Sequence, residues 1–132
     1  MLVREILGQL SLGAQLLENA TKEGLFDCDL GITGAQWAIA ETGTLVLESK
    51  SERHRLVSLV PLMHVAIIDA NCIRETLSEV LQLLTANGTS ELSRTVTFIT
   101  GPSRTSDIEL NLAIGVHGPA ELHIIVIEGE TQ

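Results

Sequence analysis

Three short apolar runs without polar alternation restrict the fold of this chain more than any other feature. They are Leu45–Leu47, Val65–Ile68 and His123–Ile127. Strands buried on both faces have this pattern, whereas a strand with one solvent face alternates apolar and polar residues. Helix-like segments separate the runs, so the sequence predicts an α/β domain with three layers, in which a mostly parallel sheet lies between helices.

The remaining elements follow from periodicity, caps and turn residues. Strands are expected at 28–32, 44–47, 63–68, 95–100 and 122–127. Helices are expected at 2–20, 37–40, 71–86 and 106–117. Asn71 is a suitable N-cap for the third of these helices, and Ser106 with Glu109 fits a capping box for the fourth.

Composition excludes several classes of protein. The 132 residues fit one domain and carry 8 Lys and Arg against 17 Asp and Glu, a net charge of −9. An acidic chain with only Phe26, Trp37 and Phe98 as aromatic residues lacks the cations and stacking platforms of nucleic-acid binding. We therefore expect no nucleic-acid partner.

The two cysteines, Cys28 and Cys72, belong to no Cys-x-x-Cys motif or Cys/His ladder. We therefore expect no zinc, no iron–sulfur cluster within this chain and no other cofactor, and a reducing compartment. The longest uncharged run, 56–68, is too short to span a bilayer, and the N-terminus does not read as a secretory signal. The sequence thus predicts a cytoplasmic protein with no membrane span.

Two stretches carry a family resemblance. One is Gly31-Ile32-Thr33 together with Ala38 to Leu47, which includes Glu41-Thr42-Gly43-Thr44. The other runs from Phe98-Ile99-Thr100-Gly101-Pro102-Ser103-Arg104 through Gly115-Val116-His117-Gly118-Pro119 to His123. Together they resemble the lactate-utilization (LUD) domain, specifically its lactate utilization protein C group, over about residues 28–127.

The resemblance implies a fold like those of ribose-5-phosphate isomerase and CoA transferases. It also implies a role in oxidising L-lactate to pyruvate, as the component without clusters beside iron–sulfur partner subunits. Family members usually have a longer region before the Gly-Ile-Thr motif, so residues 1–132 read as one LUD-type domain with a shortened N-terminal region, about 1–27. A strand missing from that region would leave a sheet edge open, which predicts self-association into a homo-oligomer.

The segment from Gly101 to Asp107 is the first candidate binding site. It follows a predicted strand and opens a predicted helix, where free N–H groups and the helix dipole favour a small anionic ligand. Arg104 could bind a carboxylate or phosphate, or could instead form a structural ion pair. The full set of candidate residues here is Gly101, Pro102, Ser103, Arg104, Thr105, Ser106 and Asp107.

The turn Thr42-Gly43-Thr44 is the second candidate, either as an ordinary turn or as part of a ligand pocket. Glu41 beside it is a weaker candidate for a reactive carboxylate. His64 and His123 lie in predicted strands and are interpreted as core or edge histidines, and His117 as a helix C-terminal residue. No catalytic residue is assigned. The alternatives to an accessory lactate-utilization component are a binding module or enzyme for a sugar phosphate, 2-hydroxy acid or CoA ester, and a redox regulator using Cys28 or Cys72.

Overall fold

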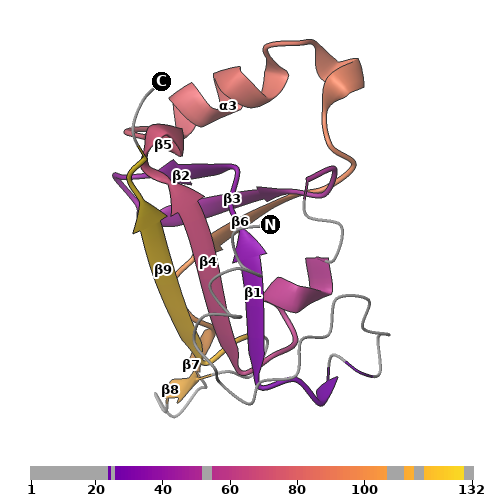
Figure 1. Cartoon of the computed structure of the whole chain (residues 1–132), viewed down its shortest axis with the longest axis vertical. Helices are drawn as coiled ribbons and strands as arrows, with labels where there is room; N and C mark the ends of the chain where they lie inside the picture. Colours follow the sequence, from indigo (N-terminus) through magenta and orange to yellow (C-terminus); the bar gives the residue numbers. More distant parts are fainter. Residues whose placement is uncertain (1–23, 25, 52–54, 107–111, 115–117, 130–132) are drawn as a thin grey trace.

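The structure, a computed structural model, describes residues 24, 26–51, 55–106, 112–114 and 118–129. One sheet is parallel and has the order β1 (Leu30–Gly34), β4 (Met63–Asp69) and β9 (Glu121–Ile127). Its strands lie side by side and point the same way in Figure 1. The predicted α/β class with a parallel sheet is therefore confirmed. The helix expected at 2–20 lies outside the described residues.

A second sheet has the order β5 (Ile73–Arg74), β2 (Trp37–Ile39), β3 (Thr44–Glu48) and β6 (Val96–Thr100). β3 runs antiparallel to both β2 and β6, whereas β2 and β5 are parallel. The prediction of one mostly parallel sheet thus holds for β1, β4 and β9 but is wrong for the strands at 44–48 and 96–100. Burial on both faces gives the same apolar run in either kind of sheet, so the pattern did not separate them.

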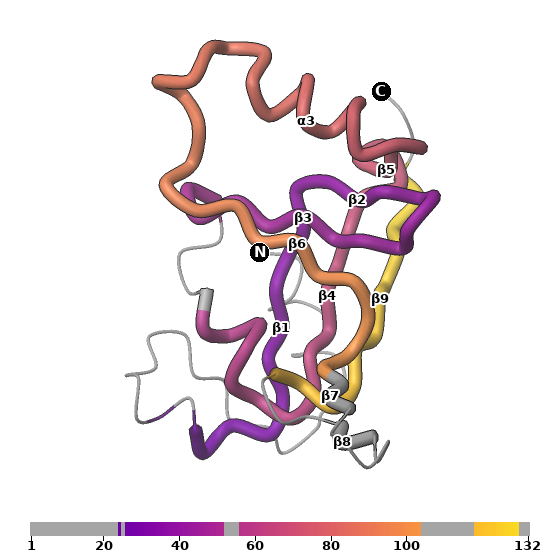
Figure 2. Tube along the Cα trace, turned by 180° about the vertical axis from the view of Figure 1, so that it is seen from behind, coloured from indigo at the N-terminus to yellow at the C-terminus, as the bar shows by residue number. Residues whose placement is uncertain are grey.

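The core explains why the centre of β3, Leu45–Leu47, is apolar. Leu45 and Leu47 pack against Ala66 of β4, while Val46 on the opposite face packs against Val80 of α3 (Leu77–Thr85). The described residues therefore form three layers, sheet on sheet on helix, and Figures 1 and 2 both show β2 and β3 between the parallel sheet and α3. The expected helix layer on this face of the parallel sheet is replaced by the second sheet.

Two helix predictions between residues 37 and 86 need correction. Trp37–Ile39 is the strand β2, because it pairs with β3 on one side and β5 on the other. The helix expected from 71 begins only at Leu77, with Thr76 and Glu79 forming its capping box. Asn71 lies instead in a short 3-10 helix, η2 (Ala70–Cys72), which the Asp69 carboxylate caps by accepting from the Asn71 N–H.

The helix expected at 106–117 is wrong where the structure describes it. Arg104–Ser106 forms β7 and Leu112–Ile114 forms β8, and the two strands pair antiparallel. Ser106 is therefore a strand residue rather than a helix cap, and Glu109 lies outside the described residues. A short apolar run such as 112–114 does not distinguish helix from strand by its periodicity, and here the backbone bonds of a partner strand decide.

Two further 3-10 helices, η1 (Arg55–Ser58) and η3 (Thr89–Glu91), complete the described elements. η1 lies against β1 (Figure 1), and η3 connects α3 to the strand β6. No helix in the described part of the chain is long and apolar enough to cross a membrane.

Candidate functional site

The turn that joins β2 to β3 carries the first candidate residues. The Ala40 N–H donates to the Arg74 carbonyl (2.7 Å) and the Glu41 N–H to the Glu75 carbonyl (3.1 Å), so β5 and its continuation hold one side of the turn. Gly43 has φ +65° and returns the chain into β3 at Thr44. Hydrogen bonds to the neighbouring backbone therefore fix the turn, and the shape of the turn sets the positions of Thr42 and Thr44.

Three threonine hydroxyls meet at this end of the second sheet. Thr44 Oγ1 lies 2.6 Å from Thr42 Oγ1 and 2.8 Å from Thr100 Oγ1. Thr44 and Thr100 are register partners in the antiparallel pair of β3 and β6. Thr44 is buried, whereas Thr42 and Thr100 are exposed. We call Thr42, Thr44 and Thr100 the threonine cluster. The sequence predicted Thr42 and Thr44 as site residues but not Thr100.

The number of hydroxyl protons limits how many hydrogen bonds this cluster can donate. Each hydroxyl has one proton to donate and lone pairs to accept, so three hydroxyls hold three protons. The two short contacts use two of them, which leaves one proton for another acceptor. When Thr44 donates to one of its two partners, the remaining proton lies on Thr42 or Thr100, which are both exposed residues, and a ligand at the surface can accept it.

The second candidate segment starts beside the cluster. Gly101 follows Thr100 directly and has φ +78°, a conformation that residues with a Cβ rarely adopt. Among the residues that the structure describes, no atom would lie within 4 Å of a Cβ on Gly101, so the corner is open toward them. The chain then passes Pro102 to Ser103, whose N–H donates to the Pro119 carbonyl (2.8 Å).

The rest of this segment enters a strand and not a helix. Arg104, Thr105 and Ser106 form the backbone of β7, and Asp107 lies outside the described residues. Because β7 replaces the predicted helix, no helix dipole favours an anion at Ser106, and the prediction of a helix N-terminal anion site there is wrong. What the fold does bring together is the Thr42-Gly43-Thr44 turn and the Thr100-Gly101 corner, through the pairing of β3 with β6.

The Glu41 carboxylate contacts the N-terminus of α3. Its Oε1 accepts from the Leu77 N–H (3.4 Å) at the first turn of α3, where Glu79 also accepts from the N–H groups of Glu75 and Thr76. Carboxylates at a helix N-terminus bond otherwise unpaired N–H groups and interact favourably with the helix dipole. These contacts favour a capping role for Glu41 over the reactive carboxylate.

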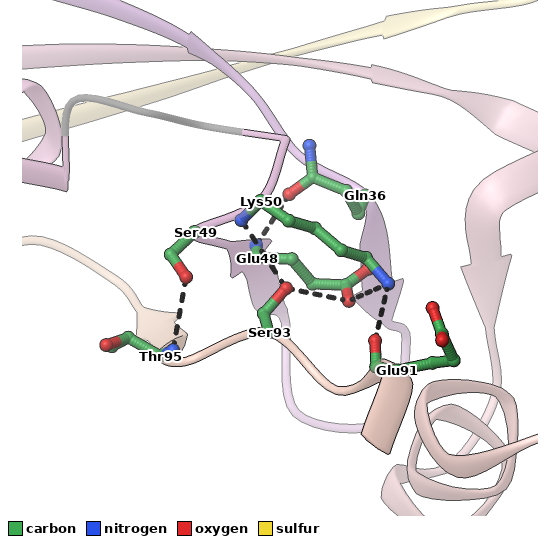
Figure 3. Close-up of polar contacts among 7 residues, drawn as sticks. All are labelled: Gln36, Glu48, Ser49, Lys50, Glu91, Ser93 and Thr95. Carbon is green, nitrogen blue, oxygen red and sulfur yellow. Dashed lines mark hydrogen bonds and ion pairs between the residues drawn. The ribbon is translucent and has the colours of Figure 1, made fainter. Parts of the chain in front are cut away.

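A second polar cluster lies at the opposite end of β3 (Figure 3). Glu48 is buried, and its Oε1 lies 3.3 Å from the Ser93 hydroxyl and 3.5 Å from Lys50 Nζ. Lys50 Nζ also donates to the Glu91 carbonyl (3.1 Å), and the Glu48 N–H donates to Gln36 Oε1 (2.7 Å). These contacts hold η3 and the segment after it against β3, so they explain the cluster by a structural role.

His64 is the third polar feature and lies in the core. Its side chain is 1% exposed, and its Nε2 lies 2.8 Å from the Thr33 hydroxyl on the neighbouring strand β1. Its Nδ1 is buried and has no hydrogen-bond partner among the described residues. Burial without a charged partner lowers the pKa of His64 below its ordinary value. The interpretation of His64 as a core histidine is confirmed, and His123 lies on an edge strand, exposed beside Glu121.

The described residues contain no group of three or more His, Cys, Asp or Glu side chains that could hold a metal ion. Cys28 and Cys72 are both half-buried free thiols, and the Cys28 Sγ–H donates to the Gly24 carbonyl (3.4 Å). His54 and His117 lie outside the described residues. The threonine cluster with its two glycine corners is therefore the arrangement that best fits the predicted ligand site.

Comparison with known proteins identifies the family. The sequence profile of the LUD domain matches residues 4–127. This chain belongs to the LUD domain family. The lactate utilization protein C of Halalkalibacterium halodurans is 41% identical over 119 residues, which are 88% of this chain and 49% of that protein. The lactate utilization protein C of Bacillus subtilis is 37% identical over 102 residues, 75% of this chain and 42% of that protein.

A solved structure has a fold similar to that of this chain. A crystal structure of a DUF162 family protein from Deinococcus radiodurans aligns with a TM-score of 0.62 at 27% identity, covering 83% of this chain and 59% of that one. The resemblance drawn from the two sequence stretches is thus confirmed at the family level. The chain spans about half the length of the curated relatives it matches.

Proposed function

We propose that this LUD domain takes part in lactate utilization as an accessory component that binds a small anion and works beside iron–sulfur partner subunits. The names of its relatives support the lactate role. The observation that carries the binding role is the contact between Thr44 and Thr100, because it joins the two sequence stretches of the family resemblance at one place.

The threonine cluster can donate one hydrogen bond to an oxygen of an anion. The uncommitted hydroxyl proton can be donated to a carboxylate or phosphate oxygen, and the open corner at Gly101 allows close approach to the backbone. The candidate ligand residues remain Thr42, Gly43 and Thr44 with 101–107. Arg104, close after Gly101 in sequence, supplies the positive charge in this proposal.

A second candidate is an enzyme or binding module of the ribose-5-phosphate isomerase or CoA-transferase type. It would use the same residues for a sugar phosphate or a CoA ester. The two candidates differ in the ligand and in the need for a partner, so ligand preference separates them.

The test of the binding role is a titration of L-lactate, pyruvate, phosphate and a CoA ester against the purified chain, with Arg104→Ala and Thr42→Val as variants. We expect a 2-hydroxy or 2-oxo acid to bind best, and Arg104→Ala to weaken binding by roughly 10- to 150-fold, as removal of a charge-assisted contact does. Equal affinity of folded wild type and Arg104→Ala would show that Arg104 is a structural residue.

The partner role needs a separate experiment. The tagged chain is purified from its source cell under anaerobic conditions, and the iron content of what accompanies it is measured. Stoichiometric recovery of an iron–sulfur protein supports the accessory role. Recovery of the chain alone, while it still binds a sugar phosphate or CoA ester, would favour the second candidate.

A further inference from the structure

The strand β9 ends the parallel sheet and pairs, within the described residues, only with β4. About half of the backbone N–H and C=O groups of such a strand point away from its neighbour. Edge strands of natural proteins usually carry Lys, Pro or a bulge that prevents another strand from adding. The sequence of β9, Glu-Leu-His-Ile-Ile-Val-Ile, contains neither Lys nor Pro. The outward backbone N–H and C=O groups of β9 can therefore pair with another strand.

The centre of β9 is apolar on both faces. Ile124, Ile125 and Val126 are 44%, 49% and 47% exposed. Successive strand residues point to opposite faces, so this exposure means that neither face of the strand is fully covered here. An added strand would bury apolar side chains on both faces at once.

The ends of the strand are acidic. Glu121 and Glu128 are exposed and flank the apolar centre, and Glu121 Oε2 lies 3.1 Å from His123 Nε2. The whole chain has a net charge of −9. A strand that adds to this edge gains most if it carries cationic residues at its ends.

Charge also argues against a second copy of this chain. Two copies can join their outer β9 edges only antiparallel about a two-fold axis normal to the sheet, which centres the pairing on one residue, such as Ile124 or Ile125. Such a dimer brings together two chains that each carry a net charge of −9 and gathers the exposed Glu121 and Glu128 of both copies along one short seam. Repulsion between chains of like net charge disfavours this association.

We propose that the outer edge of β9 is a docking site for an extended segment of another protein, apolar at its centre and flanked by Lys or Arg. The partner adds as one more strand, its backbone bonds giving affinity and its terminal cations giving preference for this edge. The proposal is independent of the anion site, because it rests on β9 and not on the threonine cluster.

The test uses short synthetic peptides with alternating Ile and Thr at the centre. One has Lys at both ends, a second has Glu there, and a third has Lys ends with Pro in the centre. We expect the Lys peptide to bind roughly tenfold or more tightly than the Glu peptide at low salt, with the difference shrinking as salt is raised. The Pro peptide should not bind, since proline removes a backbone donor.

Two chain variants locate the binding. Ile125→Lys should abolish binding of the Lys peptide, whereas Leu81→Lys, at a residue of α3 that is 45% exposed, should leave it unchanged. Amide chemical shifts should move mainly at 121–127. Equal binding of the Lys and Glu peptides, or equal weakening by both variants, would overturn the proposal. So would light scattering that shows a wild-type dimer which Ile125→Lys converts to a monomer, because a second copy would then occupy the edge.

Discussion

The hydroxyls of Thr44 and Thr100 lie 2.8 Å apart although 56 positions separate the two residues in the sequence. The pairing of β3 with β6 sets this distance, because the two residues are register partners at one end of the sheet. Thr44 is the middle member of the threonine cluster and also contacts Thr42. The cluster therefore depends on Thr44 more than on either outer residue.

Thr44→Val should lower the free energy of unfolding by about 1 kcal/mol, the usual net effect of losing a buried hydroxyl's hydrogen bonds. The matched variant Thr42→Val should have a smaller effect, because Thr42 is exposed and water can replace its contact. Urea denaturation of both variants measures the difference. A larger loss for Thr42→Val would contradict the central position of Thr44.

His64 should make stability depend on pH. Its pKa is lowered in the folded protein by burial, so the unfolded chain binds its proton more readily. Stability is therefore complete above the ordinary value of 6.5 and falls as the pH decreases from there toward the folded pKa, at up to about 1.4 kcal/mol per pH unit.

The measurement is the free energy of unfolding between pH 7.5 and 5.5, roughly the range in which histidine and not the carboxylates titrates. His64→Gln should flatten this profile. His123→Gln is the control, since His123 is exposed, and it should retain the slope of the wild type. A slope that persists in His64→Gln would assign the effect to another group.

Gly31→Ala should destabilise the protein strongly. Gly31 is buried in β1, and a Cβ there would overlap the backbone carbonyl oxygen of Val57 in η1 and press on Pro61. Backbone cannot move aside as a flexible side chain can, so the loss should reach or exceed the roughly 1–3 kcal/mol of ordinary overpacking. Gly129→Ala, whose Cβ would have no atom of the described part of the chain within 4 Å, should be close to neutral. Thermal melts of the two variants measure the difference.

Glu48→Ala should cost more stability than Lys50→Ala. The Glu48 carboxylate is buried and accepts from Ser93, so its removal leaves a cavity and takes away the acceptor of the Ser93 hydroxyl proton. We expect about 2–3 kcal/mol for Glu48→Ala, in the range for hydrogen bonds to charged groups. Lys50 is 54% exposed at its side chain, and solvent weakens its ion pair. Equal losses in guanidinium unfolding would show that the ion pair dominates this cluster.

Several features could be predicted from the sequence because local chemistry decides them. The apolar runs in β3, β4 and β9 predicted strands at these places, and β3 is buried throughout as expected. The expected burial of β9 on both faces is wrong, because Ile124, Ile125 and Val126 are 44%, 49% and 47% exposed. The burial of His64 agrees with its position directly before the apolar run Val65–Ile68. The two family stretches also lie within single segments, so they could be read without knowing how the chain folds.

The remaining features depended on which strands meet. Trp37–Ile39 and Leu112–Ile114 are too short for periodicity to separate helix from strand, and their partners β3, β5 and β7 decided it. Thr100 joined the candidate site only because β6 pairs with β3. Backbone groups must find hydrogen-bond partners, and when those partners lie tens of residues away, the choice belongs to the tertiary structure and not to the local sequence.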